Sequence, residues 1–130
     1  MLIAVLLCPN QNIMEAGEKI TNLDFLSNFA AGDTARMKKY IGMFLQIAPQ
    51  QMEKIKAALA ASDWDAVRAN AHSLKPQITY MGINGGDVLI KKIEDDAASR
   101  ANLAELPGVV NRMDELCRKA MSELELFMKQ

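Results

Sequence analysis

The chain has 130 residues, half of them hydrophobic and 5% aromatic, which is typical of one globular domain. Its 15 basic and 16 acidic residues give a formal net charge of −1, so nothing in the charge balance favours nucleic acid or an acidic membrane as partner. One histidine and two separated cysteines, Cys8 and Cys117, make a metal site unexpected and indicate free thiols in the reducing cytoplasm.

Residues 1–20 are predicted to be a tail in front of the domain. The opening segment MLIAVLLC is apolar, but it has no preceding basic segment and no small residues for signal cleavage, and it is too short to span a bilayer. Whether Met14 is the natural start stays open. No linker or repeat divides residues 21–130, which we assign to one helical domain.

The first predicted helices precede and follow Gly32-Asp33. Thr21 to Asp24 resembles a capping box that opens a short helix ending near Phe29. After Asp33 a long helix is expected, because apolar residues recur there in steps of three or four. This stripe continues through Pro49, so we predict one helix that bends at the proline. The stripe consists of Met37, Ile41, Phe44, Ala48, Met52, Ile55 and Leu59.

Ser62 and Asp65 have capping-box spacing and predict the start of another long helix. That helix is expected to end at Gly82, in a left-handed conformation, with Ile83 as the accompanying hydrophobic contact. Its apolar stripe consists of Trp64, Val67, Ala71, Leu74, Ile78 and Met81.

Two further helices are predicted. Asn84 caps the first, with Asp87 in its first turn, and Asn102 and Glu105 mark the start of the second, with Pro107 near its beginning. Their expected apolar faces are Val88, Leu89, Ile93 and Ala97 in the first, and Leu106, Val109, Met113, Leu116, Ala120, Leu124 and Phe127 in the second. Four amphipathic helices with short connections pack as antiparallel neighbours. The predicted fold is all-α, an up-and-down antiparallel four-helix bundle with a short extra N-terminal helix.

His72, the only histidine, lies in the segment AHSLKPQITYMGI of residues 71–83. On a helical wheel it projects about 130° from the centre of the apolar stripe, so it faces solvent. Lys75 lies one turn further, on the flank between core and solvent, while Arg68 and Thr79 share the histidine's side.

A lone surface histidine is usually an ordinary solvated residue. A neutral imidazole is also a nucleophile, and Lys75 can donate a charge-assisted hydrogen bond to an anion attached to the ring. Arg68 could add a second positive charge. A general acid–base pair is less expected, because no carboxylate is fixed next to His72 in the sequence.

Pro76 follows His72 by one helical turn. It lacks the N–H that would bond the His72 carbonyl, so we predict a local opening or bend. Two interpretations stay open: bundle packing tolerates the defect, or the bend turns His72 and Lys75 toward a partner.

The AHSLK segment, followed by an apolar patch and Gly82 in a helical bundle, resembles the histidine-containing phosphotransfer (HPt) domain of multistep phosphorelays. The likeness runs from about Leu23 to Phe127. It includes Gly32-Asp33, Phe44, the Pro49 region, Leu59, Asp63 and Ile93-Glu94. Pro76 departs from the family pattern, in which glycine is most common at that position.

The resemblance implies that His72 accepts a phosphoryl group from a receiver-domain aspartate and passes it to another, and that Lys75 steadies this group. It implies response-regulator receiver domains and a hybrid sensor kinase as partners, with the receiver supplying the magnesium ion. The receiver would dock around Arg68, His72 and Thr79, with Pro76 and Gly82 included in the partner-binding surface.

No P-loop of the nucleotide-binding kind occurs, and the bundle leaves no room for an ATP-binding domain. We therefore expect no cofactor and no autonomous kinase activity, and whether such a carrier counts as an enzyme stays open. A different class remains as the alternative: a helical binding module that docks a signalling partner without being phosphorylated.

Overall fold

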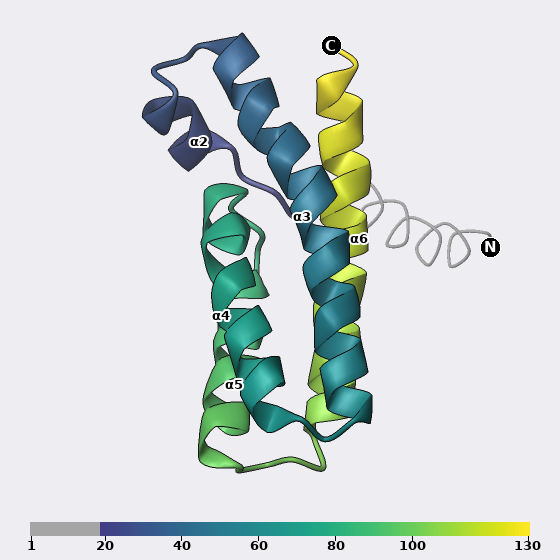
Figure 1. Cartoon of the computed structure of the whole chain (residues 1–130). Helices are drawn as coiled ribbons and strands as arrows, with labels where there is room; N and C mark the ends of the chain where they lie inside the picture. The colour runs from purple at the N-terminus through teal and green to yellow at the C-terminus, as the bar shows by residue number, and fades with distance from the viewer. Residues whose placement is uncertain (1–18) are drawn as a thin grey trace, which may run out of the picture.

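The computed structural model describes residues 19–130, in which five helices occur and no strand. The helices are α2 (Asp24–Phe29), α3 (Thr34–Ala60), α4 (Trp64–Tyr80), α5 (Gly86–Ser99) and α6 (Leu106–Met128). Helices α3 to α6 run alternately in opposite directions, and α2 lies over the C-terminal end of α4 (Figure 1). The predicted all-α bundle with its short extra helix is confirmed. Cys8 and Met14 lie outside the described residues.

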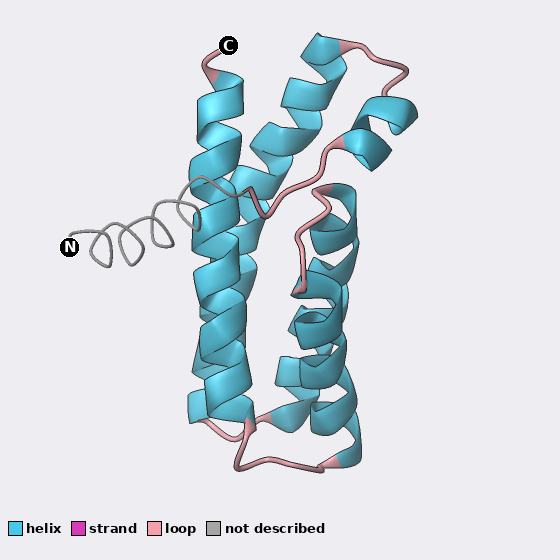
Figure 2. Cartoon of the chain, turned by 180° about the vertical axis from the view of Figure 1, so that it is seen from behind, coloured by secondary structure: helices cyan, strands magenta, loops and turns pink. Residues whose placement is uncertain are grey.

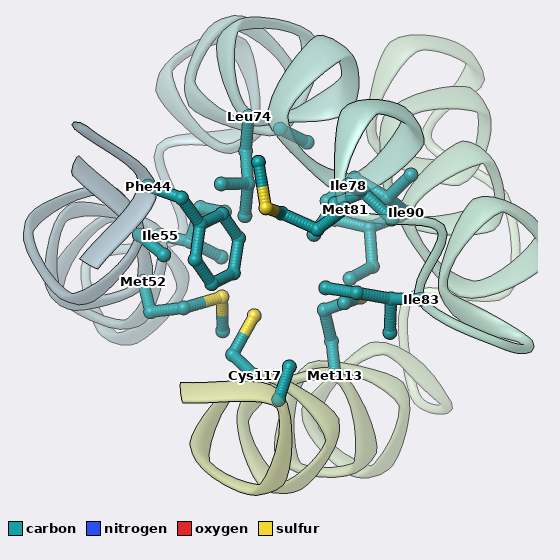
Figure 3. Packing of buried hydrophobic residues seen from close by; sticks show 14 of the residues in the cluster. Phe44, Met52, Ile55, Leu74, Ile78, Met81, Ile83, Ile90, Met113 and Cys117 are labelled. Carbon is teal, nitrogen blue, oxygen red and sulfur yellow. The ribbon is translucent and has the colours of Figure 1, made fainter. Parts of the chain in front are cut away.

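One apolar core fills the space between the four long helices (Figure 3). Phe44 of α3 is the only aromatic ring that is buried among the described residues, and it faces aliphatic and methionine side chains from α4 and α6. Cys117 of α6 also points into this core as a free thiol, and burial raises its pKa to about 12. At neutral pH this thiol therefore stays protonated and behaves as a small apolar group.

Helix α3 is continuous over 27 residues and contains Pro49. Its N-terminal part leans away from α6, so that the helix axis changes direction along its length (Figures 1 and 2). A proline causes such a change because it lacks one helical hydrogen bond and pushes back the carbonyl of the preceding turn. The predicted stripe is buried up to Ile55, after which Ala58 takes the buried position and Leu59 is half-buried.

Two helices begin at different caps from those predicted. Leu23 rather than Thr21 precedes α2, and Asn22 Oδ1 accepts a hydrogen bond from Asp24 N at 2.9 Å. The cap of α4 is Asp63, whose side chain accepts from Ala66 N at 3.2 Å. Ser62 cannot serve as that cap because it has a φ of 54° and forms the left-handed turn after α3.

The starts of α5 and α6 also differ from the prediction. Gly85, with a φ of 81°, precedes α5 in place of Asn84. Asn102 also has a positive φ, and its amide donates to Asp96, so α6 begins only at Leu106 with Pro107 in its first turn. A residue that can cap a helix can also adopt the left-handed conformation, and the sequence pattern alone did not separate the two.

The buried faces of α5 and α6 match the prediction only in part. Val88 is exposed, whereas Ile93 and Ala97 are buried as predicted, and α5 also buries Gly86 and Ile90. The cause lies at Gly86, where an added Cβ would meet Ile78 Cγ2 at 2.7 Å, so α5 approaches α4 closely along this side. In α6, Val110 and Cys117 point inward, while Val109 and Leu116 are only half-buried.

Residues 20–22 tie the start of the described chain to the bundle (Figure 2). The backbone N–H groups of Ile20 and Thr21 and the Thr21 hydroxyl all donate to the Glu123 carboxylate of α6, at 2.8–3.1 Å. Asn84 N donates to Ile20 O at 2.7 Å, and Asn22 N donates to Gly82 O at 3.1 Å. This segment therefore links α6 to the α4–α5 turn and leads directly into α2.

Gly82 ends α4 as predicted. Its φ is +56°, Ile83 N donates back to Ile78 O at 3.3 Å, and the Ile83 side chain is buried. A second constraint comes from the segment at residues 20–22, because a Cβ on Gly82 would lie 2.2 Å from Asn22 O. Only glycine fits both requirements.

We expect Gly82→Ala to lower the free energy of unfolding by about 2–3 kcal/mol, through backbone strain and the clash with Asn22. Gly42→Ala is the matched control, because its Cβ would make only an ordinary contact, 3.9 Å from Met128. It should be neutral or stabilising by up to about 1 kcal/mol. Urea unfolding of both variants checks this, and equal effects of the two substitutions would contradict it.

Candidate functional site

His72 lies in the middle of α4 on its solvent side, with 65% of its side chain exposed. The buried residues Ala71 and Leu74 occupy the opposite side of the helix. Lys75 is partly exposed on the flank that faces α5. The outward histidine and the flanking lysine are both placed as the helical wheel predicted.

Glu94 of α5 is the third member of the site. Its Oε2 lies 2.6 Å from His72 Nδ1 and its Oε1 lies 2.7 Å from Lys75 Nζ, so one carboxylate bridges both side chains. The Glu94 side chain is only 14% exposed. Sequence spacing did not reveal this contact, because Glu94 follows His72 by 22 residues on a different helix. A carboxylate is therefore fixed next to His72 in space, although none is near it in sequence.

The charges of this cluster stabilise one another. The Lys75 hydrogen bond is the main cause that lowers the pKa of Glu94, with a further contribution from His72, and partial burial opposes them. The same hydrogen bond raises the pKa of Lys75. At neutral pH Glu94 is thus a carboxylate and Lys75 an ammonium.

The ionised state of Glu94 fixes the tautomer of His72. A carboxylate only accepts hydrogen bonds, so the 2.6 Å contact requires a proton on His72 Nδ1. In the neutral ring the lone pair is then on Nε2, at the side of the imidazole away from Glu94. The site therefore presents an oriented, solvent-facing nitrogen nucleophile next to an ammonium group.

The remaining candidate residues have different surroundings. Arg68 is exposed one turn before His72, and Thr79 Oγ1 lies 3.3 Å from both the Lys75 carbonyl and Asp87 Oδ1. Helix α4 continues through the exposed Pro76 to Tyr80. Gly82 packs against Asn22 within the chain, so its structural role is distinct from the partner contact that the sequence suggested.

A helical bundle with an exposed, oriented histidine beside a lysine is the arrangement of a histidine phosphotransfer domain. A family model of the Hpt domain matches residues 39–125, and the chain belongs to the Hpt domain family. It is thus a phosphorelay intermediate, and domains of this family exchange phosphoryl groups with receiver domains.

The fold is similar to that of a solved protein. The crystal structure of histidine-containing phosphotransfer protein B (HptB) from Pseudomonas aeruginosa PAO1 matches with a TM-score of 0.77 and 20% sequence identity. The match covers 85% of this chain and 95% of that chain. A sequence comparison with curated proteins gave no match. Within residues 19–130, no helix combines the length and apolar character needed to cross a membrane.

The bridging carboxylate predicts a defined pH dependence of stability. Because the fold lowers the pKa of Glu94 below its ordinary 4.5, the folded state favours the ionised carboxylate. That stabilisation is complete above about pH 4.5 and is lost as the pH falls through the lower, folded-state value.

We expect wild type to be more stable than Glu94→Gln near pH 7, because the glutamine has no charge to pair with Lys75. The difference should be constant down to about pH 5 and shrink as the pH falls toward 3. Urea unfolding of both proteins across this pH range measures it. A difference that does not change between pH 7 and pH 3 would show that the carboxylate charge adds nothing to stability.

Proposed function

We propose that His72 is the phosphoacceptor of this domain, taking a phosphoryl group from the aspartyl phosphate of one receiver and giving it to the aspartate of another. The observation that carries the proposal is the hydrogen bond from His72 Nδ1 to Glu94, which leaves Nε2 as the free nucleophile. His72 is also the only histidine of the chain.

The transfer step uses this tautomer directly. The Nε2 lone pair attacks phosphorus, the N–P bond forms, and the bond from phosphorus to the aspartate oxygen breaks as the carboxylate leaves. The ring then carries a proton on Nδ1 and phosphorus on Nε2, so it is cationic, and the Glu94 carboxylate stabilises that charge. In the second transfer a receiver aspartate attacks phosphorus, and the electron pair of the N–P bond returns to Nε2.

Lys75 has two roles in this proposal. A phosphoryl group on His72 adds about two negative charges to the site. The ammonium of Lys75 is near this group, because Lys75 is bonded to the same Glu94 carboxylate that contacts His72. It would donate to a phosphoryl oxygen. It also offsets the negative charge of Glu94, which would otherwise repel the incoming group.

Receiver domains of response regulators and an upstream hybrid sensor kinase are the proposed partners, in the cytoplasm. Membership of the Hpt family supports this, because domains of the family exchange phosphoryl groups with receiver domains. Arg68, Pro76 and Thr79 are exposed around His72 on α4 and are proposed as contacts of the receiver.

The proposal predicts that incubation with phosphorylated receiver domains puts an acid-labile label on wild type and none on His72→Gln. Autoradiography before and after acid treatment checks this, with circular dichroism to show that the variant is folded. If no receiver of the source organism labels wild type, the alternative of a non-phosphorylated binding module is favoured.

We expect Lys75→Ala to slow phosphotransfer roughly tenfold while the fold stays intact, because one charged donor to the phosphoryl group is lost. Lys91→Ala is the matched control, since Lys91 is an exposed lysine of α5 that pairs with Asp95 rather than with Glu94. It should transfer at the wild-type rate. Rapid-quench measurements in both directions test the pair of variants, and an unchanged rate for Lys75→Ala would remove Lys75 from the site.

A further inference from the structure

A groove lies on the surface of the bundle between α5 and α6, and we call it the α5–α6 groove. It has a volume of about 590 Å³, and its apolar lining consists of Val88, Leu89 and Leu116. Val88 is 72% exposed, and Leu89 and Leu116 are half-buried. The periodicity of the sequence assigned all three residues to apolar faces. Within residues 19–130 this apolar strip is thus left with incomplete cover.

The described chain begins beside one end of the α5–α6 groove. Asn84, which lines the groove, donates its backbone N–H to Ile20 O at 2.7 Å, and Ile20 N donates to Glu123 Oε2 at 2.9 Å. Glu123 follows Lys119, another residue of the lining, by one helical turn. Residues 1–18 are therefore attached to the bundle next to this groove.

The start of the chain has the composition that such a groove requires. The side chains of MLIAVLLC, residues 1–8, are all apolar, and we call these residues the N-terminal apolar segment. Moving apolar side chains from water onto an apolar surface is favourable. Residues 9–18, the connection to the bundle, contain Glu15 and Glu18 and no basic residue. The charged residues that line the groove are positive on balance: Arg112, Glu115 and Lys119.

The length of the connection allows the N-terminal apolar segment to reach the groove. Along α6 the groove extends from Lys119 to Arg112, which is about 11 Å, and Glu123 lies about 6 Å beyond Lys119. The far end of the groove is thus about 17 Å from the anchor at Glu123. The ten residues of the connection span up to about 33 Å when extended.

Attachment to the same chain favours this segment over a second copy of the protein as the occupant. A short connection within one chain gives the two groups that it joins an effective concentration on the order of mM. The same segment on another molecule competes only at the bulk concentration of the protein. In dilute solution the groove is therefore filled from within the chain.

We propose that the N-terminal apolar segment folds back into the α5–α6 groove and covers Val88, Leu89 and Leu116. The acidic residues of the connection then face the basic residues of α6, and the segment completes the apolar packing of α5 against α6. His72 does not line this groove, so the inference does not rest on the proposed phosphotransfer.

Nuclear Overhauser effects in the full chain test the contact directly. We expect them between methyl groups of the N-terminal apolar segment and those of Val88, Leu89 or Leu116. An equimolar mixture of isotope-labelled and unlabelled chains separates contacts within a chain from contacts between chains. Contacts found only between chains would mean that a second copy fills the groove, and no contacts at all would mean that the segment stays outside it. Either result overturns the inference.

Urea unfolding of full-chain variants measures the contribution of the contact to stability. Leu2→Asp/Leu6→Asp puts charges into the segment, and Val88→Asp puts one into the groove at an exposed position. Each should lower the urea midpoint by about 1 M, because each releases the segment. The combined variant should lower it by little more than either alone, since the segment can be released only once.

Met43→Asp is the matched control, because Met43 is a 41% exposed apolar residue of α3 that does not line the groove. Its shift of the midpoint should add in full to that of Leu2→Asp/Leu6→Asp. Three results would overturn the inference: an unchanged midpoint in Leu2→Asp/Leu6→Asp, full additivity with Val88→Asp, or equal non-additivity with Met43→Asp. None of these measurements uses a receiver, so a failure of the proposed function would leave them unaffected.

Discussion

The contact of one carboxylate with two side chains of α4 is the interaction on which the site depends. Glu94 fixes the proton of His72 on Nδ1 and holds the ammonium of Lys75 beside the ring. Each of these effects requires a charged carboxylate, and the pKa of Glu94 is lowered by the side chains that it orients. In the proposed phosphotransfer, His72 is thus oriented before any partner arrives, so little of the cost of ordering falls on the transfer step.

That contact depends in turn on the register between α4 and α5. Gly86 lies against Ile78, where a side chain larger than hydrogen would not fit. From this point Glu94 lies about 12 Å along α5, and His72 lies about 9 Å back along α4, which runs in the opposite direction. The difference between these two distances along the helices is small enough for a glutamate side chain to span. The close contact at Gly86 therefore brings the Glu94 carboxylate opposite His72.

The sequence predicted the features that follow from the geometry of a single helix, and it missed the features that depend on how two helices pack together. The periodic stripes located all four long helices, and the wheel placed His72 outward and Lys75 on the flank, because both positions follow from the rise and turn of a single helix. Helix starts were less certain, since Ser62 and Asn102 occupy left-handed turns although their side chains are common caps. The Glu94 contact and the exposure of Val88 both follow from the rotation of α5 against its neighbours, which no local pattern contains.

The position of α2 relative to His72 follows from a constraint at the far end of α4. The chain passes Gly82 so closely that Asn22 O occupies the space of a missing Cβ, and α2 begins at Asp24 directly afterwards. The Glu123 carboxylate holds the preceding residues against α6. The turn that ends α4, the helix of His72, thus also fixes the helix that carries the exposed Phe25 and Phe29. The same turn therefore sets where Phe25 and Phe29 of α2 stack on Tyr80, the last residue of α4.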